Sequence, residues 1–412
     1  MRKLLASMKP RGTALAAVGT AIVSGVALAA CGTVGSTAFQ NGTSSPSVAA
    51  TNGSAAPAAP GVVLPGFKVL SMSFVSDTNG FALGTVACGT GLCDSLLTST
   101  NGGATWSKLT APTTAAPTAA AGTGDVVSCP SSQPCDAQVR FATPEIGYAY
   151  DPSLEVTTDG GAHWQPQSAG SVTSLEAADG TAVRVANASP GCSGAQAQVS
   201  SASVGAGSWQ ALPAPAVSQI CPAVLYRQGD RLVLAAYGNP AGGTPATAQI
   251  ARSSDGGKTW ASGPDSCGGT DGYASAVTLA QPQVLVLLCR HQMPLSNGGY
   301  GPAWVRVSDN DGATFGPDEQ VPSLQSASAG TILSYQLAAS SSGRLLVTES
   351  SPTGSEALLT QNGGQSWSPT LSIPAGTVVL VGYEDTLTGR IAAGDQVWTT
   401  HDGGSTWTAN EF

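Results

Sequence analysis

Short apolar or alternating runs, separated by turns rich in Gly, Asp and Asn, recur from residue 66 to the end of the chain. Runs of about four to eight residues bounded by such turns indicate β-strands. The clearest group combines 223–227, a Gly229-Asp230 turn, 231–237 and 248–252. In full, the pattern predicts strands at 69–74, 80–84, 95–98, 138–142, 147–150, 154–157, 172–177, 182–186, 195–199, 223–227, 231–237, 248–252, 274–279, 284–288, 303–307, 332–338, 344–349, 357–359, 378–383, 390–393 and 396–398.

An eight-residue signature follows six of these groups and reads Ser/Thr-x-Asp/Asn-x-Gly-x-Thr/Ser-Trp/Phe. We call it the octapeptide. A period of about 40–60 residues built of short strands is typical of a β-propeller. Each octapeptide would then turn the third strand of a blade into the fourth. The copies are 99–106 (STNGGATW), 157–164 (TTDGGAHW, with His163 in seventh place), 253–260 (SSDGGKTW), 308–315 (SDNDGATF), 360–367 (TQNGGQSW) and 400–407 (THDGGSTW).

The interval between Trp164 and Trp260 is too long for one repeat. The strands predicted at 172–177, 182–186 and 195–199 fill it, and 205–209 (GAGSW) reads as the end of a degenerate seventh octapeptide. We therefore predict an all-β, seven-bladed propeller, with six or eight blades as alternatives. Ring closure would need the first or last repeat to share strands, and 61–64 could supply an edge strand.

The chemistry of the octapeptide is structural. Its third residue can accept hydrogen bonds from the amides of its own turn, its fifth permits a positive φ, and its last is a large aromatic suited to the crevice between blades. The third position alternates between Asn and Asp, which argues against a catalytic or calcium role. The third residues are Asn101, Asp159, Asp255, Asn310, Asn362 and Asp402, and the last are Trp106, Trp164, Trp260, Phe315, Trp367 and Trp407.

The first 60 residues have a different composition. Residues 1–30 combine a cationic start with a small-residue apolar stretch, as in an export signal. The sequence Leu28-Ala29-Ala30-Cys31 resembles a bacterial lipobox, which implies cleavage before Cys31 and lipidation of its thiol. An ordinary signal peptide or an uncleaved membrane helix are the alternatives. Residues 31–60 have little to bury, so we expect a disordered tether, followed by the propeller at 61–412.

The charge balance excludes several partners. Removing the four basic residues of the signal leaves 12 basic against 25 acidic residues, a formal charge of −13. Such a chain is a poor match for nucleic acid or for a basic-patch contact with lipid. We expect no cofactor, no nucleic acid and a monomer.

Cys31 aside, eight cysteines remain: Cys88, Cys93, Cys129, Cys135, Cys192, Cys221, Cys267 and Cys289. An even number in an exported protein indicates disulfides. Proximity in sequence favours 88–93, 129–135, 192–221 and 267–289 among many possible connectivities. Zinc is the rival, but the chain has no CxxC pair and only three histidines, so we predict no metal site.

The octapeptides resemble Asp-box (BNR) repeats, which occur in sialidase-like propellers, sortilin-type receptors and the photosystem II assembly factor family. The phrases Ser73-Phe74, 80–84 and 97–103, echoed by Arg140-Phe141 and 147–149, look most like the assembly-factor branch. That family presents a basic face to its partner, whereas this chain is acidic.

The sialidase resemblance implies three arginines, a Tyr–Glu nucleophile pair and an Asp acid/base. The chain lacks the early Phe-Arg-Ile-Pro-like motif and has no Arg between Arg11 and Arg140. Tyr383-Glu384-Asp385 is a candidate for the pair, and a chance match is the alternative. We therefore assign no catalytic residue.

Propeller topology places the octapeptides on one face and the long loops on the other, which usually binds ligands. By this assignment all eight cysteines lie on or near the loop side, either as staples that order a binding surface or as protection against proteases. The insert 290–302 is our candidate contact loop, with Arg290, His291 and Tyr300; solvated surface is the alternative. Tyr148, Tyr273 and Tyr383 could line the mouth.

Together these features predict a lipid-anchored, extracytoplasmic propeller on the cell membrane. We expect it to bind a protein or glycan partner through its loops without catalysis. The alternative is a divergent glycoside hydrolase of the sialidase type.

Overall fold

The structure of the chain is a computed structural model. It describes residues 64–89, 91–112, 138–151, 153–168, 170–187, 198–215, 223–236, 249–264, 267, 272–281, 283–291, 303–322, 334–351, 354–374 and 378–412. All of them belong to one compact unit, Thr33–Phe412. Every regular element in these ranges is a β-strand, and none of their segments is a helix long and apolar enough to cross a membrane.

The strands form seven antiparallel sheets of four, each made of strands consecutive in sequence. The sheets are β1 (Lys68–Phe74), β2 (Gly80–Cys88), β3 (Gly91–Ser99) and β4 (Ser107–Leu109); β5 (Gln138–Phe141), β6 (Gly147–Tyr150), β7 (Leu154–Thr157) and β8 (Gln165–Pro166); β9 (Ser171–Ala178), β10 (Thr181–Asn187), β11 (Gln198–Ser203) and β12 (Gln210–Ala211); β13 (Ala223–Gln228), β14 (Arg231–Ala236), β15 (Gln249–Ser253) and β16 (Ala261–Pro264); β17 (Gly272–Ala280), β18 (Val284–His291), β19 (Trp304–Ser308) and β20 (Glu319–Gln320); β21 (Ser334–Ala339), β22 (Leu345–Ser351), β23 (Gly354–Thr360) and β24 (Ser368–Ile373); β25 (Val378–Tyr383), β26 (Gly389–Ala393), β27 (Gln396–Thr400) and β28 (Thr408–Glu411).

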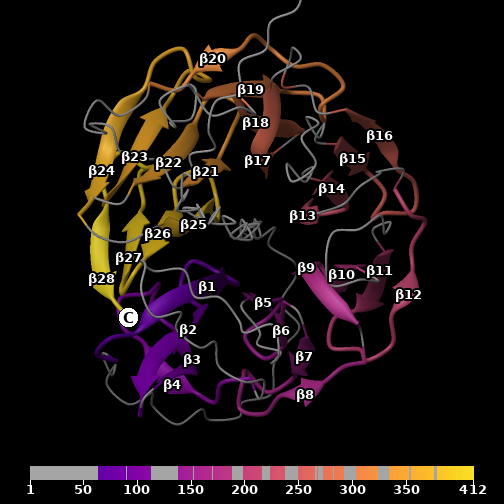
Figure 1. Cartoon of the computed structure of the whole chain (residues 1–412), viewed down its shortest axis with the longest axis vertical. Helices are drawn as coiled ribbons and strands as arrows, with labels where there is room; N and C mark the ends of the chain where they lie inside the picture. Colours follow the sequence, from indigo (N-terminus) through magenta and orange to yellow (C-terminus); the bar gives the residue numbers. More distant parts are fainter. Residues whose placement is uncertain are drawn as a thin grey trace, which may run out of the picture. The chain divides into compact units, whose positions relative to one another are not determined.

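The first strand of each sheet lies at the centre of a ring (Figure 1). These strands contact one another in order around it, β1 with β5, then β9, β13, β17, β21 and β25, and β25 contacts β1 again. The unit is a seven-bladed β-propeller. The predicted blade count is confirmed, including the third blade, whose octapeptide is degenerate.

The third blade also holds a strand whose predicted end was wrong. Its third strand was predicted at 195–199, whereas β11 continues to Ser203 and pairs with β10 from Ala186↔Gln198 to Thr181↔Ser203; residues 195–197 lie outside the described ranges. The prediction chose the first apolar alternation after β10. In the structure, the pairing of β11 with β10 places Val199 at the seam with the next blade, beside Leu225 and Leu234.

Seven separate apolar clusters fill the seams between neighbouring blades. Each contains the aromatic residue that ends an octapeptide or, in the third blade, Trp209. Trp164, for example, packs with Phe81 and Phe141 between the first and second blades, and the rings of Phe81 and Phe141 stack at 3.5 Å between centroids. The octapeptide therefore joins a turn to a seam, as the sequence predicts.

Polar side chains join the innermost strands across the seams. Ser71 of β1 accepts a hydrogen bond from the Val139 amide at 3.1 Å, and Ser73 accepts one from Phe141 at 2.9 Å. Ser174 of β9 does the same for Leu225 of β13 at 2.9 Å. These hydroxyls satisfy amides on the inner edge of the following blade, which would otherwise be buried without a partner.

The ring closes without a shared strand, since the first and seventh sheets each contain four strands of their own. At this seam the Phe412 ring lies 5.2 Å from Phe67 and 5.1 Å from Trp106 between centroids. Leu64 contributes a single bond, from its amide to the Phe412 carbonyl at 3.3 Å, and joins no sheet. The edge strand considered for 61–64 is therefore not present at Leu64, and the other three residues lie outside the described ranges.

Candidate functional site

The six octapeptides share one set of hydrogen bonds. The hydroxyl of the first residue donates to Oδ1 of the third, at 2.8 to 3.0 Å, and accepts from the amide of the fifth. The same Oδ1 accepts the amide of the seventh residue at 2.9 Å in every copy. The side chain of the third residue is thus hydrogen-bonded within its own turn. This holds both for the copies with Asn (Asn101, Asn310 and Asn362) and for those with Asp (Asp159, Asp255 and Asp402).

Asn and Asp are interchangeable because the seventh residue adapts to them. Asn101 donates its amide to the Thr105 hydroxyl at 2.8 Å, whereas Asp255 accepts from the Thr259 hydroxyl at 2.7 Å. In the second octapeptide His163 takes the place of Thr, with Nδ1 2.6 Å from Asp159 Oδ2. Hydrogen bonds from the seventh residue lower the pKa of Asp159, Asp255 and Asp402 to about 2.

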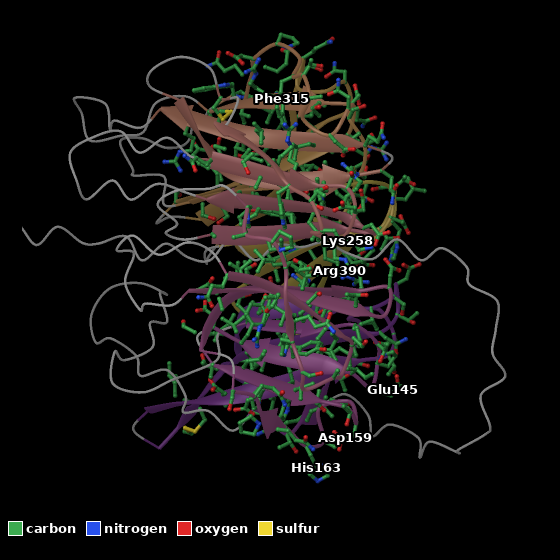
Figure 2. The ribbon with its side chains drawn as sticks, turned by 90° about the vertical axis from the view of Figure 1, so that its right-hand side faces the viewer. Glu145, Asp159, His163, Lys258, Phe315 and Arg390 are labelled. Atoms are coloured by element: carbon green, nitrogen blue, oxygen red, sulfur yellow. A yellow bond between two sulfur atoms is a disulfide. The ribbon has the colours of Figure 1, made fainter. Side chains whose placement is uncertain are left out.

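The octapeptides also define one face of the ring. The fourth residue of each donates its amide to the turn between the first and second strands of the same blade, as in Gly102 to the Thr78 carbonyl and Gly160 to the Glu145 carbonyl, both at 2.8 Å. Both kinds of turn therefore meet at one end of every sheet. We call this end the octapeptide face and the opposite end, with the turns between second and third strands, the loop face; Figure 2 labels Glu145, Asp159, His163 and Lys258 on the octapeptide face.

The hydrogen bonds to the octapeptide aspartates lead to a prediction about stability in acid. Each octapeptide Asp has a folded pKa near 2, below its ordinary value of about 3.9, so its stabilisation is present above about pH 4 and is lost as the pH falls towards 2. We expect Asp255→Asn to leave the melting temperature at pH 7 nearly unchanged, because Asn makes the same bonds in three sister turns. Asp255→Ala should lower it. Thermal melts between pH 7 and 2.5 measure both, and a flatter acid limb in a variant with all three Asp replaced by Asn is the expected companion result.

The loop face carries a projecting hairpin. β1 pairs with β2 only as far as Lys68↔Thr85, whereas β2 and β3 continue to Cys88↔Gly91. The last residues of this hairpin are joined by a disulfide between Cys88 and Cys93. In Figure 2 the indigo hairpin extends to the left, away from the octapeptide face. Among the described residues that extend this hairpin beyond Thr85, those exposed are Ala87, Gly89, Gly91 and Cys93.

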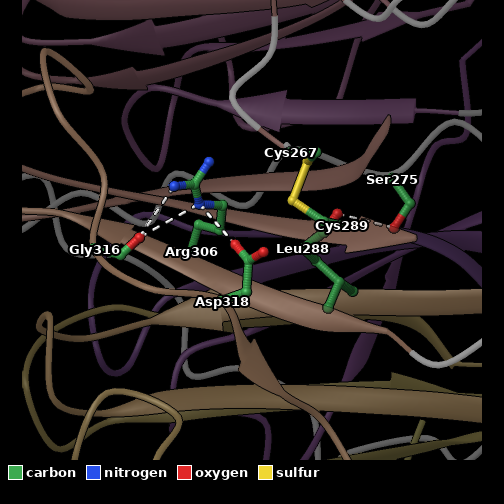
Figure 3. The surroundings of a disulfide bond; sticks show 7 residues. All are labelled: Cys267, Ser275, Leu288, Cys289, Arg306, Gly316 and Asp318. Carbon is green, nitrogen blue, oxygen red and sulfur yellow. Dashed lines mark hydrogen bonds and ion pairs between the residues drawn. A yellow bond between two sulfur atoms is a disulfide. The ribbon is translucent and has the colours of Figure 1, made fainter. Parts of the chain in front are cut away.

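A second disulfide, Cys267–Cys289, joins the link before β17 to β18 (Figure 3). Both cysteines are fully buried. Beside it the Ser275 hydroxyl donates to the Leu288 carbonyl at 3.1 Å, and Arg306 pairs with Asp318 at 3.0 Å. These are two of the four predicted bridges; Cys129, Cys135, Cys192 and Cys221 lie outside the described residues, as does Cys31.

The candidate contact loop differs from its prediction. Arg290 and His291 belong to β18 rather than to a loop, and Tyr300 lies outside the described residues. Arg290 is 7% exposed and its guanidinium lies 4.8 Å from the centroid of the Tyr335 ring, in the seam between the fifth and sixth blades. The unbroken apolar run from Val284 to Cys289, which leads directly into Arg290, was the signal that could have placed Arg290 in the strand.

Arg290 faces a polar row that sequence reasoning missed. Tyr335 pairs with Glu349 across β21 and β22, and Glu349 pairs with Glu356 across β22 and β23, so the three side chains share a sheet face. Tyr335 and Glu349 are buried, and Glu356 is half-buried. Burial raises the pKa of Tyr335, with Glu349 adding to the shift, and burial also raises that of Glu356. The row holds a Tyr–Glu pair and one arginine, covered by the neighbouring blade.

The Tyr–Glu pair expected at Tyr383-Glu384 lies elsewhere. Tyr383 donates its hydroxyl to the Gly403 carbonyl of an octapeptide at 3.0 Å, and Glu384 forms a buried ion pair with Arg390. Both belong to the octapeptide face. Tyr148 is fully buried, and its hydroxyl accepts a hydrogen bond from the Gly205 amide at 2.8 Å. Neither Tyr148 nor Tyr383 therefore lines the mouth of the ring.

A further buried pair joins the second and third blades. Arg140 of β5 and Glu176 of β9 lie 3.2 Å apart, and burial raises the pKa of Glu176 to about 8 against the opposing effect of Arg140. The described residues contain no group of three or more His, Cys, Asp or Glu side chains that could hold a metal ion. Among the described residues, the buried ion pairs lie at the seams between blades and are not gathered at one site.

Comparisons with known proteins agree on the fold. No protein-family model matches the chain, and no curated protein matches it by sequence. Among solved structures it is similar to YCF48 bound to D1 peptide, with 18% identity over 85% of this chain and 96% of that one and a TM-score of 0.50. YCF48 from Cyanidioschyzon merolae gives 14% identity over 83% and 98%, with a TM-score of 0.52.

An ulvan lyase bound to a glucuronate–rhamnose-sulfate ligand is similar as well, with 7% identity over 86% of this chain and 97% of that one and a TM-score of 0.53. At these identities the likeness describes the fold alone. The neighbours include both a peptide-binding and a glycan-cleaving propeller, so fold does not decide between binding and catalysis.

Proposed function

We propose that this protein is a lipid-anchored, extracytoplasmic propeller that binds a protein or glycan partner through its loop face without catalysis. The observation that carries the proposal is the disulfide-closed hairpin tip of β2 and β3, which projects beyond the sheet at the end opposite the octapeptides. A covalently closed tip loses less conformational freedom on binding than an open one, so it lowers the cost of association.

The placement of the acidic groups favours binding over catalysis. The octapeptide carboxylates bond their own turns, and Glu176 and Glu384 pair with Arg140 and Arg390 inside the blades. A hydrolase of glycosides needs two accessible carboxylates at a set separation. YCF48 supports the protein-partner form of the proposal, since that similar propeller is described as bound to a peptide.

Site-specific photocrosslinking tests the binding face. A photoreactive residue at Ala87 or Leu92, both in the hairpin, should give discrete crosslinked species in intact cells. The matched control is the same residue at Lys258, which is exposed on the octapeptide face. Equal crosslinking from Ala87 and Lys258, or none from either hairpin position, would contradict the proposed face.

The anchor has its own test. We expect Cys31→Ala to abolish labelling by a clickable fatty acid and to move the protein from the membrane to the soluble extracytoplasmic fraction, because the lipobox-like sequence Leu28–Cys31 offers no other acceptor thiol. Unchanged lipid labelling and retention would contradict lipidation. Cys88→Ser serves as the control that removes a cysteine without removing the anchor.

A sialidase-type hydrolase is the second candidate, favoured by the Tyr335–Glu349 pair beside Arg290. This hypothesis predicts turnover of a fluorogenic sialoside that is lost in Tyr335→Phe and in Glu349→Gln. Glu356→Gln is a useful companion, since its carboxyl is the half-exposed member of the row. Absence of turnover by the wild-type protein leaves the binding proposal as the function.

A further inference from the structure

The described chain joins the ring on its loop face. The Leu64 amide donates to the Phe412 carbonyl, and the Phe412 amide donates to the Asp395 carbonyl at 3.1 Å. Val69, at the start of β1, donates to the Gly394 carbonyl at 2.8 Å. Gly394 and Asp395 form the turn between β26 and β27, which belongs to the loop face. Whatever precedes Leu64 therefore starts from the side that carries the disulfide hairpin.

The octapeptide face is acidic. Carboxylates stand in the turns of nearly every blade at this end, and each is exposed or half-exposed. They occur in six of the seven blades, so the charge is not confined to one blade. Its members are Asp77, Glu145, Asp159, Asp179, Asp230, Asp255, Asp309, Asp311, Asp385 and Asp402.

The arginines at the same end neutralise part of this charge. Arg390 is fully buried, and Arg344 reaches across a seam to the Thr386 carbonyl at 3.4 Å. Arg231 forms an ion pair with Asp311 and donates to the Ala280 carbonyl at 3.1 Å, so it cancels one member of the set. Among the described turn residues at this end, Lys258 is the exposed lysine.

We propose that the ring holds its loop face toward the membrane and its octapeptide face toward the aqueous side. This orientation rests on the proposed anchor at Cys31. Anionic headgroups repel carboxylates within about one Debye length, roughly 8 Å at physiological salt. The opposite orientation would bring these carboxylates against that surface, and the cations Arg231, Arg252, Arg344 and Lys258 at the same end are fewer than the carboxylates.

The point of attachment acts in the same direction. Thirty-two residues separate Cys31 from Leu64. Because the described chain joins the ring on its loop face, that face lies next to Leu64, whereas the octapeptide face lies at the other end of every sheet. Beside Leu64 and Phe412, Lys68 and Asp395 lie 4.0 Å apart and compensate each other.

Fluorescence quenching measures the orientation. The lipidated full-length protein is reconstituted into vesicles containing phosphatidylglycerol and a headgroup-attached nitroxide quencher. A dye is placed through a clickable residue either at Ala87 in the hairpin or at Lys258 in the octapeptide face. We expect quenching at Ala87 to exceed that at Lys258 by about threefold or more, because a headgroup nitroxide quenches only dyes that come close to the membrane surface.

A charge variant separates the two contributions. Asp77→Asn, Glu145→Gln and Asp179→Asn together remove three exposed charges outside the octapeptides. This variant should remain on the vesicles and show a smaller ratio between the two dyes. The quencher-free vesicle gives the baseline for each dye position.

Each outcome has one meaning. If neither dye is quenched although the protein floats with the vesicles, the anchor stands and the orientation is wrong; if the protein does not float with them, the anchor fails as well. If both dyes are quenched equally, or Lys258 more strongly, the anchor stands and the orientation is wrong. If the charge variant keeps the full ratio, the acidic face does not orient the ring, and the electrostatic part of the inference is overturned.

Discussion

Replacing Arg390 by methionine is expected to lower the free energy of unfolding by about 3–5 kcal/mol, the cost of breaking a buried ion pair by removing one partner. Arg390 is fully buried and pairs with Glu384. It also donates to the Asp77 carbonyl at 2.8 Å in the first blade and to the Thr399 hydroxyl at 2.9 Å in the seventh. One side chain thus joins both sides of the closing seam, and the variant leaves Glu384 buried without its partner.

The pH dependence gives this prediction its sign. Burial raises the pKa of Glu384, with Arg390 opposing the shift. Without Arg390 the folded protein holds the proton on Glu384 to higher pH than the unfolded chain does, so the variant loses stability as the pH rises above about 4.5. Denaturant melts at pH 5 and pH 8 should therefore show the larger deficit at pH 8.

The double variant Arg390→Met/Glu384→Gln is the matched control. It removes the buried charge, and it should recover part of the lost stability. Arg344→Met, which removes a half-exposed arginine with a single long bond across a seam, should cost less than about 1 kcal/mol. A deficit for Arg390→Met as small as that of Arg344→Met would contradict the assigned role.

The second large effect is expected at Trp106. Its indole is 2% exposed and packs against Phe412 at 5.1 Å and Phe74 at 6.1 Å between ring centroids. Trp106→Ala should lower the free energy of unfolding by about 3–5 kcal/mol, the usual cost of truncating a buried tryptophan. Equilibrium unfolding in urea measures it.

Trp407 provides the comparison for Trp106. It ends the seventh octapeptide in the same way but is half-buried, between the sixth and seventh blades. Trp407→Ala should therefore cost clearly less. Similar losses for the two variants would show that burial at the closing seam has no special weight.

The repeat pattern predicted the blades because it is local. Turn residues and the terminal aromatic lie within eight positions, so their spacing survives in the sequence of each copy. The pairing of Arg140 with Glu176 depends on which blades become neighbours and on the register between them, and no local spacing encodes that. A charged residue inside an otherwise apolar strand, such as Glu176 between Leu175 and Ala177, was the available signal.

The candidate site shows the same division. The two disulfides described, Cys88–Cys93 and Cys267–Cys289, join cysteines that are near in sequence. Arg290 was assigned to a loop because a polar Arg-His pair ends the apolar run, yet the aromatic ring of Tyr335 in the next blade gives the guanidinium a buried place. The contact with the neighbouring blade therefore determines that Arg290 is buried in the strand, and the sequence at the strand boundary does not reveal this contact.

The closing seam has a consequence for the order of assembly. Its bonds from Arg390 to Gly102 and Asp77 span 288 and 313 positions of the chain, whereas the other seams join consecutive blades. Contacts so distant in sequence carry the largest loop-closure entropy and form slowly. We therefore expect six seams to form progressively along the chain and the seventh to form last. With no shared strand to hold it, this seam is also where we expect the ring to open first under tension or during attack by an unfolding protease.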